Sequence, residues 1–256
     1  MSTVLLEKRD NIAVVTLNRP EQMNALSREL RNDFCAAFKQ CQADDAIRVV
    51  IVTGNGKAFC AGFDLKEMSS PDTSNAAEAS ENEMASVMRE FDGPIIAAIN
   101  GHAITGGFEI ALACDVIIAS DRARFADTHA RVGILPGWGL SQKLPRLIGL
   151  SRAKQISFSG NPVFAQQAYE WGLVNEVVAA DQLLTRASQL ATDMCQCVPH
   201  ILVQYKALID EGYSKHYEDA LAYEAEIGIT SAKAATGSIV ADRVEGVLQR
   251  GRNEKH

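Results

Sequence analysis

Two glycine-containing segments constrain the fold of this chain more than any other feature. They run from Lys57 to Glu67, KAFCAGFDLKE, and from Asn100 to Asp115, NGHAITGGFEIALACD. Each follows a short apolar run, Val49 to Thr53 in one case and Ile95 to Ile99 in the other. Each segment therefore has the pattern of a buried strand that turns into a loop or a helix. Two such strand ends are able to lie side by side in one sheet.

The two turns are built from small residues, which predicts an anion site made of main-chain groups. Without bulky side chains, backbone N–H groups approach a ligand directly. The small residues are Ala61, Gly62, Gly106 and Gly107. Such preorganised donors suit a carbonyl oxygen that gains negative charge during a reaction. Glu109 falls in the first turn of the following helix, where backward tilt directs its side chain toward the glycines and the helix N-terminus favours a carboxylate base.

The remaining hydrophobic pattern predicts an α/β core followed by a helical tail. Apolar runs predict strands at 4–6, 13–17, 49–53, 95–100, 116–119 and 173–177. Helices are predicted at 27–42, 107–113, 141–148, 152–159 and 165–171, and the polar stretch 69–82 is predicted to be a mobile loop. No strand pattern recurs beyond Asp181. We therefore predict an α/β core over residues 1–180 and a helical region over residues 181–256.

Composition is ordinary for a soluble globular protein. A chain of 256 residues with 47% hydrophobic and 22% charged residues is long enough for one core domain and a smaller appendage. The net charge of −7 argues against nucleic acid as a partner, although helix N-termini still hold phosphates on an acidic protein. The N-terminal sequence has no signal or transit pattern, so we expect a cytoplasmic protein with no membrane partner. The six cysteines lack zinc-site spacing, and no metal is expected.

Five segments, in order, make the chain similar to the enoyl-CoA hydratase/isomerase (crotonase) family. They are TLNRPEQMNAL (Thr16–Leu26), KAFCAGFDLKE, the GG-x-E turn that ends at Glu109, FADTHARVGILPGWG (Phe125–Gly139) and AQQAYEWGLVNEVV (Ala165–Val178). The resemblance implies a crotonase-like α/β spiral of ββα units, with a C-terminal helical oligomerisation region that packs across subunits in a homotrimer or a hexamer. It also implies an acyl-CoA thioester as the partner and no cofactor apart from coenzyme A as part of the substrate.

The resemblance also assigns roles within the two glycine segments. Ala61 and Gly106 match the residues whose N–H groups form the family's oxyanion hole around a thioester carbonyl. Glu109 matches the catalytic base. The residues implied to contact the substrate are Ala61, Gly62, Phe63, Asp64, Gly106 and Trp138. Phe63 and Asp64 are expected to act through their backbone, and Trp138 either lines the acyl pocket or only packs.

His129 departs from the pattern of the hydratases that use two glutamates. The position of the second acid, four residues after Phe125, carries His129 here. Imidazole titrates near neutrality and both donates and accepts protons, so it is able to replace a carboxylic acid in protonating the α-carbon. A second interpretation stays open, in which His129 only packs or hydrogen-bonds and Glu109 works alone.

The predicted function is acyl-CoA chemistry through an oxyanion-stabilised enolate. Hydration of a 2-enoyl-CoA to a 3-hydroxyacyl-CoA, a hydro-lyase reaction of fatty acid metabolism, fits best, with Glu109 directing water and His129 handling the α-carbon proton. The alternatives are a Δ3-Δ2 enoyl-CoA isomerase, an acyl-CoA hydrolase or decarboxylase, and an acyl-CoA binder without activity. Retention of Glu109 argues against the last of these.

Overall fold

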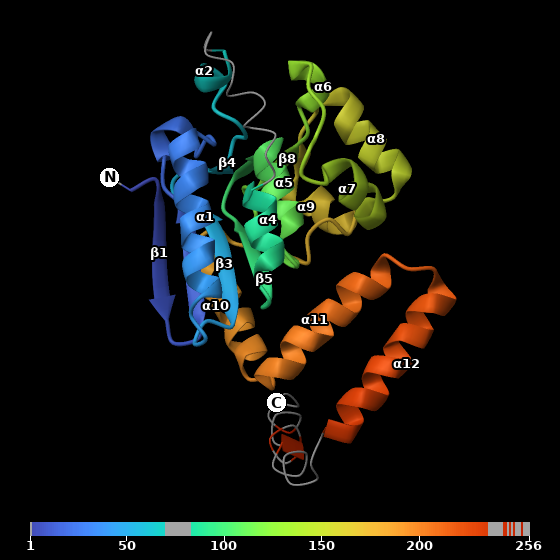
Figure 1. The fold of residues 1–256 in the computed structure, drawn as a ribbon. Coiled ribbons are helices and arrows are strands. Elements are labelled where there is room, and N and C mark those ends of the chain that lie inside the picture. Colours follow the sequence, from blue (N-terminus) through green and yellow to red (C-terminus); the bar gives the residue numbers. More distant parts are fainter. Residues whose placement is uncertain are drawn as a thin grey trace. The chain divides into compact units, whose positions relative to one another are not determined.

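The computed structural model of the protein describes residues 2–69 and 83–234, together with single positions at 243, 244, 246, 248 and 252. The chain forms two compact units, Met1–Val203 and Gln204–His256. The larger unit contains both β-sheets and the helices up to α10 (Leu183–Cys195) (Figure 1). We expected the boundary near Asp181. It falls later because α10 packs on the main sheet through Leu183, Ala187 and Ala191.

A six-stranded sheet forms the centre of the larger unit. Its strands lie in the order β1-β2-β3-β5-β7-β10. β1 and β2 form an antiparallel hairpin, and all other neighbours are parallel. The strands are β1 (Val4–Arg9), β2 (Ile12–Leu17), β3 (Val49–Gly54), β5 (Ile95–Ile99), β7 (Val116–Ser120) and β10 (Glu176–Val178). All six predicted strands are therefore present, although the last begins later than expected.

The alternation of side chains along β3 divides the core into two layers. Val50 and Val52 belong to the larger apolar cluster, whereas Val49 and Ile51 pack with α10 on the opposite face. Burial on both faces explains why this strand is a continuous apolar run in the sequence. The helices that contribute to the larger cluster include α1 (Arg28–Gln42), α4 (Glu83–Glu90) and α5 (Gly106–Ala113).

A second sheet of four short strands carries the segments that the sequence singled out. Its order is β4-β6-β8-β9, with β4, β6 and β8 parallel and β9 antiparallel to β8. The strands are β4 (Ala58–Cys60), β6 (His102–Ile104), β8 (Arg124–Ala126) and β9 (Val163–Phe164). The three parallel strands end at the same edge of the sheet, where ligands bind in open α/β sheets. The residues that follow these strands are therefore brought together.

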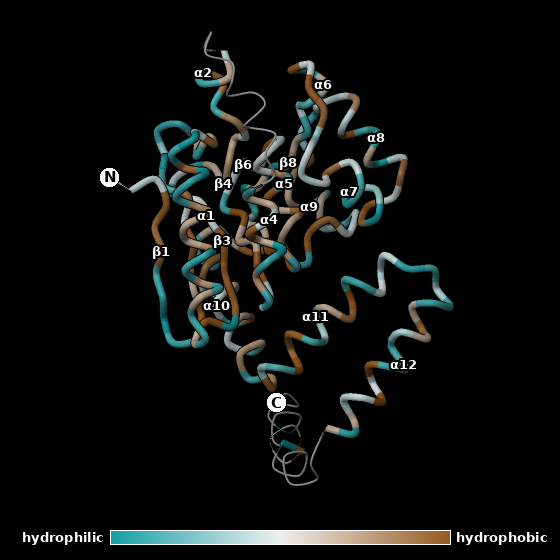
Figure 2. The backbone as a smooth tube through the Cα atoms, in the orientation of Figure 1, coloured by the Kyte–Doolittle hydropathy of each residue, from teal (hydrophilic) through white to brown (hydrophobic). Residues whose placement is uncertain are grey.

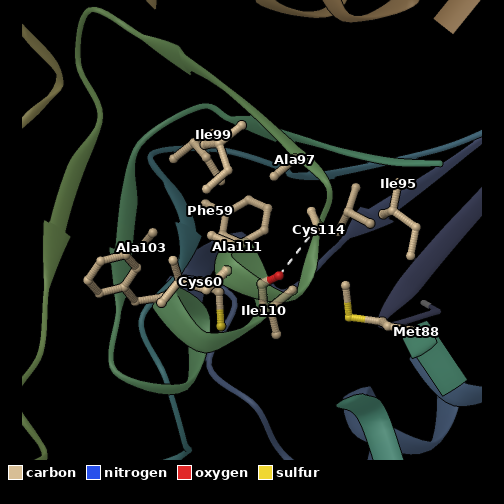
Figure 3. Close-up of a cluster of buried hydrophobic side chains, with 14 of the residues drawn as sticks. Phe59, Cys60, Met88, Ile95, Ala97, Ile99, Ala103, Ile110, Ala111 and Cys114 are labelled. Carbon is tan, nitrogen blue, oxygen red and sulfur yellow. Dashed lines mark hydrogen bonds between the residues drawn. The ribbon is translucent and has the colours of Figure 1, made fainter. Parts of the chain in front are cut away.

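Helix α5 is buried on all sides, which fixes the position of its first turn. Every residue from Gly106 to Leu112 is buried. Figure 3 shows the inner residues of α5 packed among apolar side chains of β4, β5 and α4. The close approach to β4 requires Gly107, because a Cβ at this position would lie 2.2 Å from the Cys60 carbonyl oxygen.

The predicted helix over residues 27–42 is confirmed as α1. Ser27 is its N-cap and accepts a hydrogen bond from the Leu30 N–H. The stretch predicted to be a mobile loop, residues 69–82, lies outside the described residues apart from Ser69. The other helical elements of the larger unit are η1 (Pro20–Gln22), α2 (Leu65–Met68), α6 (His129–Val132), α7 (Leu140–Ile148), α8 (Leu150–Ser159) and α9 (Ala165–Glu170).

Two further helices, α11 (Pro199–Tyr213) and α12 (Tyr217–Ala234), follow α10. Brown apolar positions and teal polar positions are interleaved along both helices in Figure 2. Several of the apolar side chains are exposed, namely Tyr205, Ile209, Tyr213, Tyr217, Leu221 and Ile229. Among the described helices, none has both the length and the apolar character needed to cross a membrane.

Candidate active site

The turns after β4 and β6 meet at the edge of the small sheet. Gly62 has a φ of +88°, in the left-handed region that favours glycine. A Cβ at this residue would lie 3.0 Å from the Ile104 carbonyl oxygen and 3.4 Å from the Gly106 nitrogen. The two glycine segments thus lie side by side, and a side chain at Gly62 would crowd the turn that leads to Gly106.

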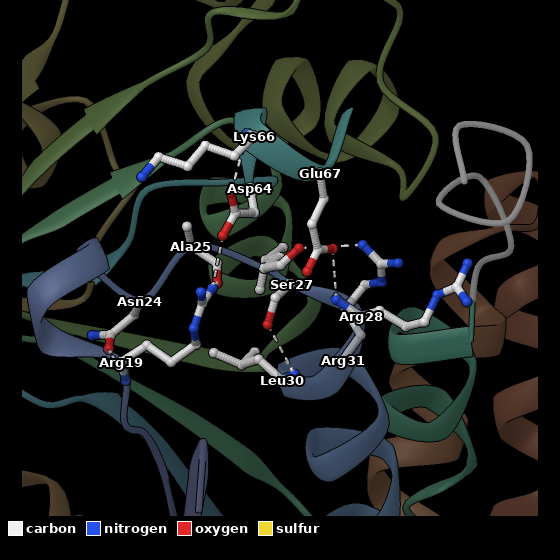
Figure 4. A network of polar contacts seen from close by, with 11 residues as sticks. Arg19, Asn24, Ala25, Ser27, Arg28, Leu30, Arg31, Asp64, Lys66 and Glu67 are labelled. Carbon is white, nitrogen blue, oxygen red and sulfur yellow. Dashed lines mark hydrogen bonds and ion pairs between the residues drawn. The ribbon is translucent and has the colours of Figure 1, made fainter. Parts of the chain in front are cut away.

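Polar contacts anchor the turn after β4 on its outer side (Figure 4). The Leu26 N–H donates to the Gly62 carbonyl oxygen at 2.8 Å. The Asp64 carboxylate accepts hydrogen bonds from the Arg19 guanidinium at 3.0 Å and from the Lys66 N–H at 3.1 Å. Burial would raise the pKa of Asp64, but these hydrogen bonds hold it below its usual value. The Asp64 side chain is therefore engaged in holding the loop.

One of the two predicted N–H donors is already occupied. The Ala61 N–H donates to the Met23 carbonyl oxygen at 3.0 Å, so the prediction that Ala61 forms an oxyanion hole is wrong. Within the described residues, no acceptor receives the N–H of Phe63 or that of Gly106. The positive φ of Gly62 turns the chain, so that the N–H groups before and after it point differently. Sequence spacing alone does not reveal that change of direction.

Thr105 joins the Gly106 turn to the segment after β8. Its φ of 53° is rare for a β-branched residue and is strained. Its Oγ1 accepts the Thr128 N–H at 3.1 Å and lies 2.5 Å from the Thr128 Oγ1. The Thr105 N–H donates to the Ala126 carbonyl oxygen at 2.9 Å. These bonds tie the turn that presents Gly106 to the residue that precedes His129.

Glu109 lies in the first turn of α5, and its side chain is buried. Its Oε1 accepts the backbone N–H of Trp138 at 2.7 Å. Its Oε2 faces the Nε2 of His129 at 3.5 Å. A buried carboxylate needs such partners, because it has lost its hydration. The structure therefore places the two predicted catalytic side chains in contact.

His129 begins α6 and lies between two carboxylates. Its Nδ1 is 2.7 Å from the Oδ1 of Asp127, which also accepts the His129 N–H at 3.1 Å. Burial by itself lowers the pKa of His129, but hydrogen bonds to Asp127 and Glu109 and the charges of both raise it to about 9. The imidazole is therefore protonated at neutral pH. In the described part of the chain, no group of three or more His, Cys, Asp or Glu side chains is arranged to hold a metal ion.

Trp138 and Phe63 form an aromatic pair beside Glu109. Their ring centroids are 5.2 Å apart and their planes are tilted by 60°. The Trp138 residue is buried, at 7% exposure, and the Arg31 guanidinium lies 5.5 Å from the centroid of the Phe63 ring. Trp138 thus meets Phe63 through its ring and Glu109 through its backbone. The second of these contacts was not predicted.

Sequence reasoning missed two residues of the site, Asp127 and Thr105. It expected Phe63 to act through its backbone but did not single out its N–H. Asp127 had a local signal, because a short acidic side chain readily accepts the N–H of the second residue along the chain. Thr105 had none, since its positive φ contradicts the ordinary preference of threonine.

Comparisons with known proteins extend over nearly the whole chain. The model of the family described as Enoyl-CoA hydratase/isomerase matches residues 7–238. The probable enoyl-CoA hydratase 1, peroxisomal, of Arabidopsis thaliana is 41% identical over 215 residues, which cover 84% of this chain and 81% of the plant protein.

Two solved structures have the same fold. Enoyl-CoA hydratase from Bacillus anthracis has a TM-score of 0.87 at 33% identity, covering 98% of this chain and 96% of that protein. A monofunctional enoyl CoA isomerase from M. smegmatis has a TM-score of 0.75 at 33% identity, covering 86% of this chain and 99% of that protein. The fold is therefore shared by a protein named as a hydratase and one named as an isomerase.

Proposed function

This chain belongs to the enoyl-CoA hydratase/isomerase family, and we propose that it hydrates 2-enoyl-CoA thioesters to 3-hydroxyacyl-CoA thioesters. The observation that carries the proposal is the buried contact of Glu109 with His129, 3.5 Å apart in the first turns of α5 and α6. Hydration needs a group that takes a proton from water and a group that gives a proton to the α-carbon. A carboxylate beside an imidazolium supplies both.

The N–H groups of Phe63 and Gly106 are the proposed donors to the thioester carbonyl oxygen. The first N–H groups of a helix have no acceptor within the helix, and Gly106 is the first residue of α5. Phe63 directly follows Gly62, at which a Cβ would lie 3.4 Å from the Gly106 nitrogen. Two fixed donors would stabilise the negative charge of the enolate oxygen without reorganisation. This assignment replaces Ala61, whose N–H is occupied.

The proposed proton transfers form a closed cycle. Glu109 takes a proton from water as the water oxygen bonds to the β-carbon and the π electrons move into the thioester enolate. The α-carbon then takes the proton from the Nε2 of His129, which leaves a neutral imidazole. The Glu109 Oε2 lies 3.5 Å from that nitrogen, so the proton taken from water returns to His129. One water is consumed, and both side chains regain their starting states.

A Δ3-Δ2 enoyl-CoA isomerase is the second candidate. Its support is the likeness to the M. smegmatis isomerase, and the same pair of side chains is suited to moving a proton between two carbons. Hydratase and isomerase differ in whether water enters the product.

A substrate panel separates these functions. The purified protein is incubated with crotonyl-CoA, a 3-enoyl-CoA and a saturated acyl-CoA. The products are separated by liquid chromatography against authentic standards, which distinguishes isomers of equal mass, and identified by mass spectrometry. The proposal expects 3-hydroxybutyryl-CoA from crotonyl-CoA. Conversion of the 3-enoyl-CoA alone would favour the isomerase, hydrolysis of the saturated thioester would favour a hydrolase, and binding without turnover would contradict all three.

We also propose that the chain assembles as a homotrimer or a hexamer. The support is the set of exposed apolar side chains on α11 and α12, including Tyr205, Ile209, Leu221 and Ile229. Light scattering during size-exclusion chromatography measures the mass in solution. A monomer of 27.7 kDa would contradict the proposal.

A further inference from the structure

Asp127 is a buried carboxylate to which the proposed chemistry gives no direct task. Its Oδ1 accepts both the backbone N–H of His129 and the hydrogen on His129 Nδ1, at 3.1 Å and 2.7 Å. Its side chain is 3% exposed. The side chain of Ser157 on α8 also donates a hydrogen bond to the Asp127 carboxylate. Asp127 therefore binds the imidazole from the side opposite Glu109.

From these contacts we infer that Asp127 is a positioning residue that holds His129 as an imidazolium with Nε2 directed at Glu109 and the reacting carbon. The inference deepens the proposed hydration mechanism and rests on it, because it assigns the atom and the charge state through which His129 acts. Asp127 would not touch the substrate.

The geometry determines which nitrogen exchanges its proton. An imidazolium carries hydrogens on both ring nitrogens, and Asp127 accepts the one on Nδ1. When Nε2 gives its proton to the α-carbon, the remaining hydrogen stays on Nδ1, where Asp127 holds it. The Nε2 lone pair then faces Glu109 Oε2 at 3.5 Å, in position to be protonated again. Without Asp127, the neutral ring would be free to adopt the other tautomer.

The charges around the His129 imidazole also support a positioning role for Asp127. Among the described residues, the charged groups that face the imidazole are Glu109 from α5 and Asp127 from the loop after β8, while α8 contributes the neutral hydroxyl of Ser157. Burial alone would raise the pKa of Asp127, but hydrogen bonds from His129 and Ser157 lower it. Asp127 therefore stays ionised, and its charge supports the cation that burial opposes. A neutral residue of the same shape would keep the packing and remove that support.

The test compares Asp127→Asn with the parent protein. The variant should lower kcat for crotonyl-CoA by about tenfold or more, leave KM nearly unchanged, and move the upper limb of the pH profile to lower pH. Asp121→Asn is the matched control, because Asp121 is exposed in the turn after β7. A normal pH profile in Asp127→Asn would overturn the inference.

Imidazole ¹⁵N NMR of the parent protein gives a readout that needs no turnover. The chain has five histidines, and the His129 signal is assigned by its loss in His129→Ala. The inference expects Nδ1 to keep its hydrogen above and below the midpoint while Nε2 titrates. Titration at Nδ1 would overturn it. Normal hydration by His129→Ala would instead contradict the proposed role of His129, so the two failures are distinguishable.

Discussion

The Oε2 of Glu109 and the Nε2 of His129 lie 3.5 Å apart, and both side chains are buried. Glu109 follows β6 and His129 follows β8, and these strands pair in parallel through Ile104 and Ala126 at their ends. The contact is therefore fixed by the register of the small sheet. A change of register by one residue would move the two side chains apart.

Glu109→Gln should remove most hydratase activity, because the amide keeps the shape of the side chain but does not accept a proton from water. Binding of an acyl-CoA thioester should be largely retained. Turnover of crotonyl-CoA and calorimetric titration measure the two effects separately. Glu7→Gln is the matched control, since Glu7 is exposed on β1 and pairs with Arg9. Near-parental turnover by Glu109→Gln would show that the base lies elsewhere.

The proposed oxyanion hole, with the N–H of Phe63 in place of that of Ala61, predicts different effects at two nearby backbone positions. Replacing Phe63 by phenyllactate turns its N–H into an ester oxygen and should lower kcat by about 10²-fold or more. Replacing Ala61 by lactate removes only the bond to the Met23 carbonyl and should affect stability more than rate. Circular dichroism and kcat are measured for both proteins. A lower kcat for the Ala61 ester than for the Phe63 ester would instead indicate that Ala61 is the donor.

The strained backbone of Thr105 predicts an unusual ranking of substitutions. Thr105→Ala loses the hydroxyl contacts with Thr128 and keeps a positive φ, whereas Thr105→Gly loses the same contacts but tolerates that φ. The glycine variant should therefore be more stable than the alanine variant by about 1 kcal/mol. Urea unfolding measures the difference. The control is Thr192→Ala, on the exposed side of α10, which should change stability little. If Thr105→Gly were less stable than Thr105→Ala, the backbone at Thr105 would not be strained.

The raised pKa of His129 sets the direction of the pH dependence. Its value is about 9 in the fold and 6.5 without the protein environment. Protonation of His129 therefore stabilises the fold fully below about pH 6.5, and this contribution is lost as the pH rises through about 9. The proton donor is lost over the same range, so kcat should fall along a limb near pH 9. A profile of kcat from neutral to alkaline pH checks this, and a limb near pH 6.5 would contradict the pairing with Asp127.

Elements with a local sequence signal could be predicted better than elements that depend on long-range packing. The strand over residues 49–53 and the helix over residues 27–42 were predicted, because continuous apolar runs and a serine N-cap are local signals. The three-residue strands β4, β6 and β8 were not, since three residues show no alternation. These short strands are what brings Gly62, Gly106 and His129 to one edge of a sheet.

The site shows the same division. Glu109 and His129 were predicted from motifs, and the structure places them in contact. The proposed role of Asp127 depends on a loop geometry that folds its carboxylate back onto the imidazole. The choice between the N–H groups of Ala61 and Phe63 depends on the φ of Gly62. Neither the loop geometry at Asp127 nor the φ of Gly62 can be read from residue identity alone, because both arise from the strand pairing around the turn.

The central claim is that Glu109 and His129 act together as base and acid in hydration. It is tested most directly by the rate of crotonyl-CoA hydration in His129→Ala beside His129→Glu. The alanine variant should be slower by about 10²-fold or more, and the glutamate variant should recover most of the parental rate, because a carboxyl next to two carboxylates holds a proton. Parental hydration by His129→Ala would contradict the claim, because Glu109 would then handle both proton transfers without His129.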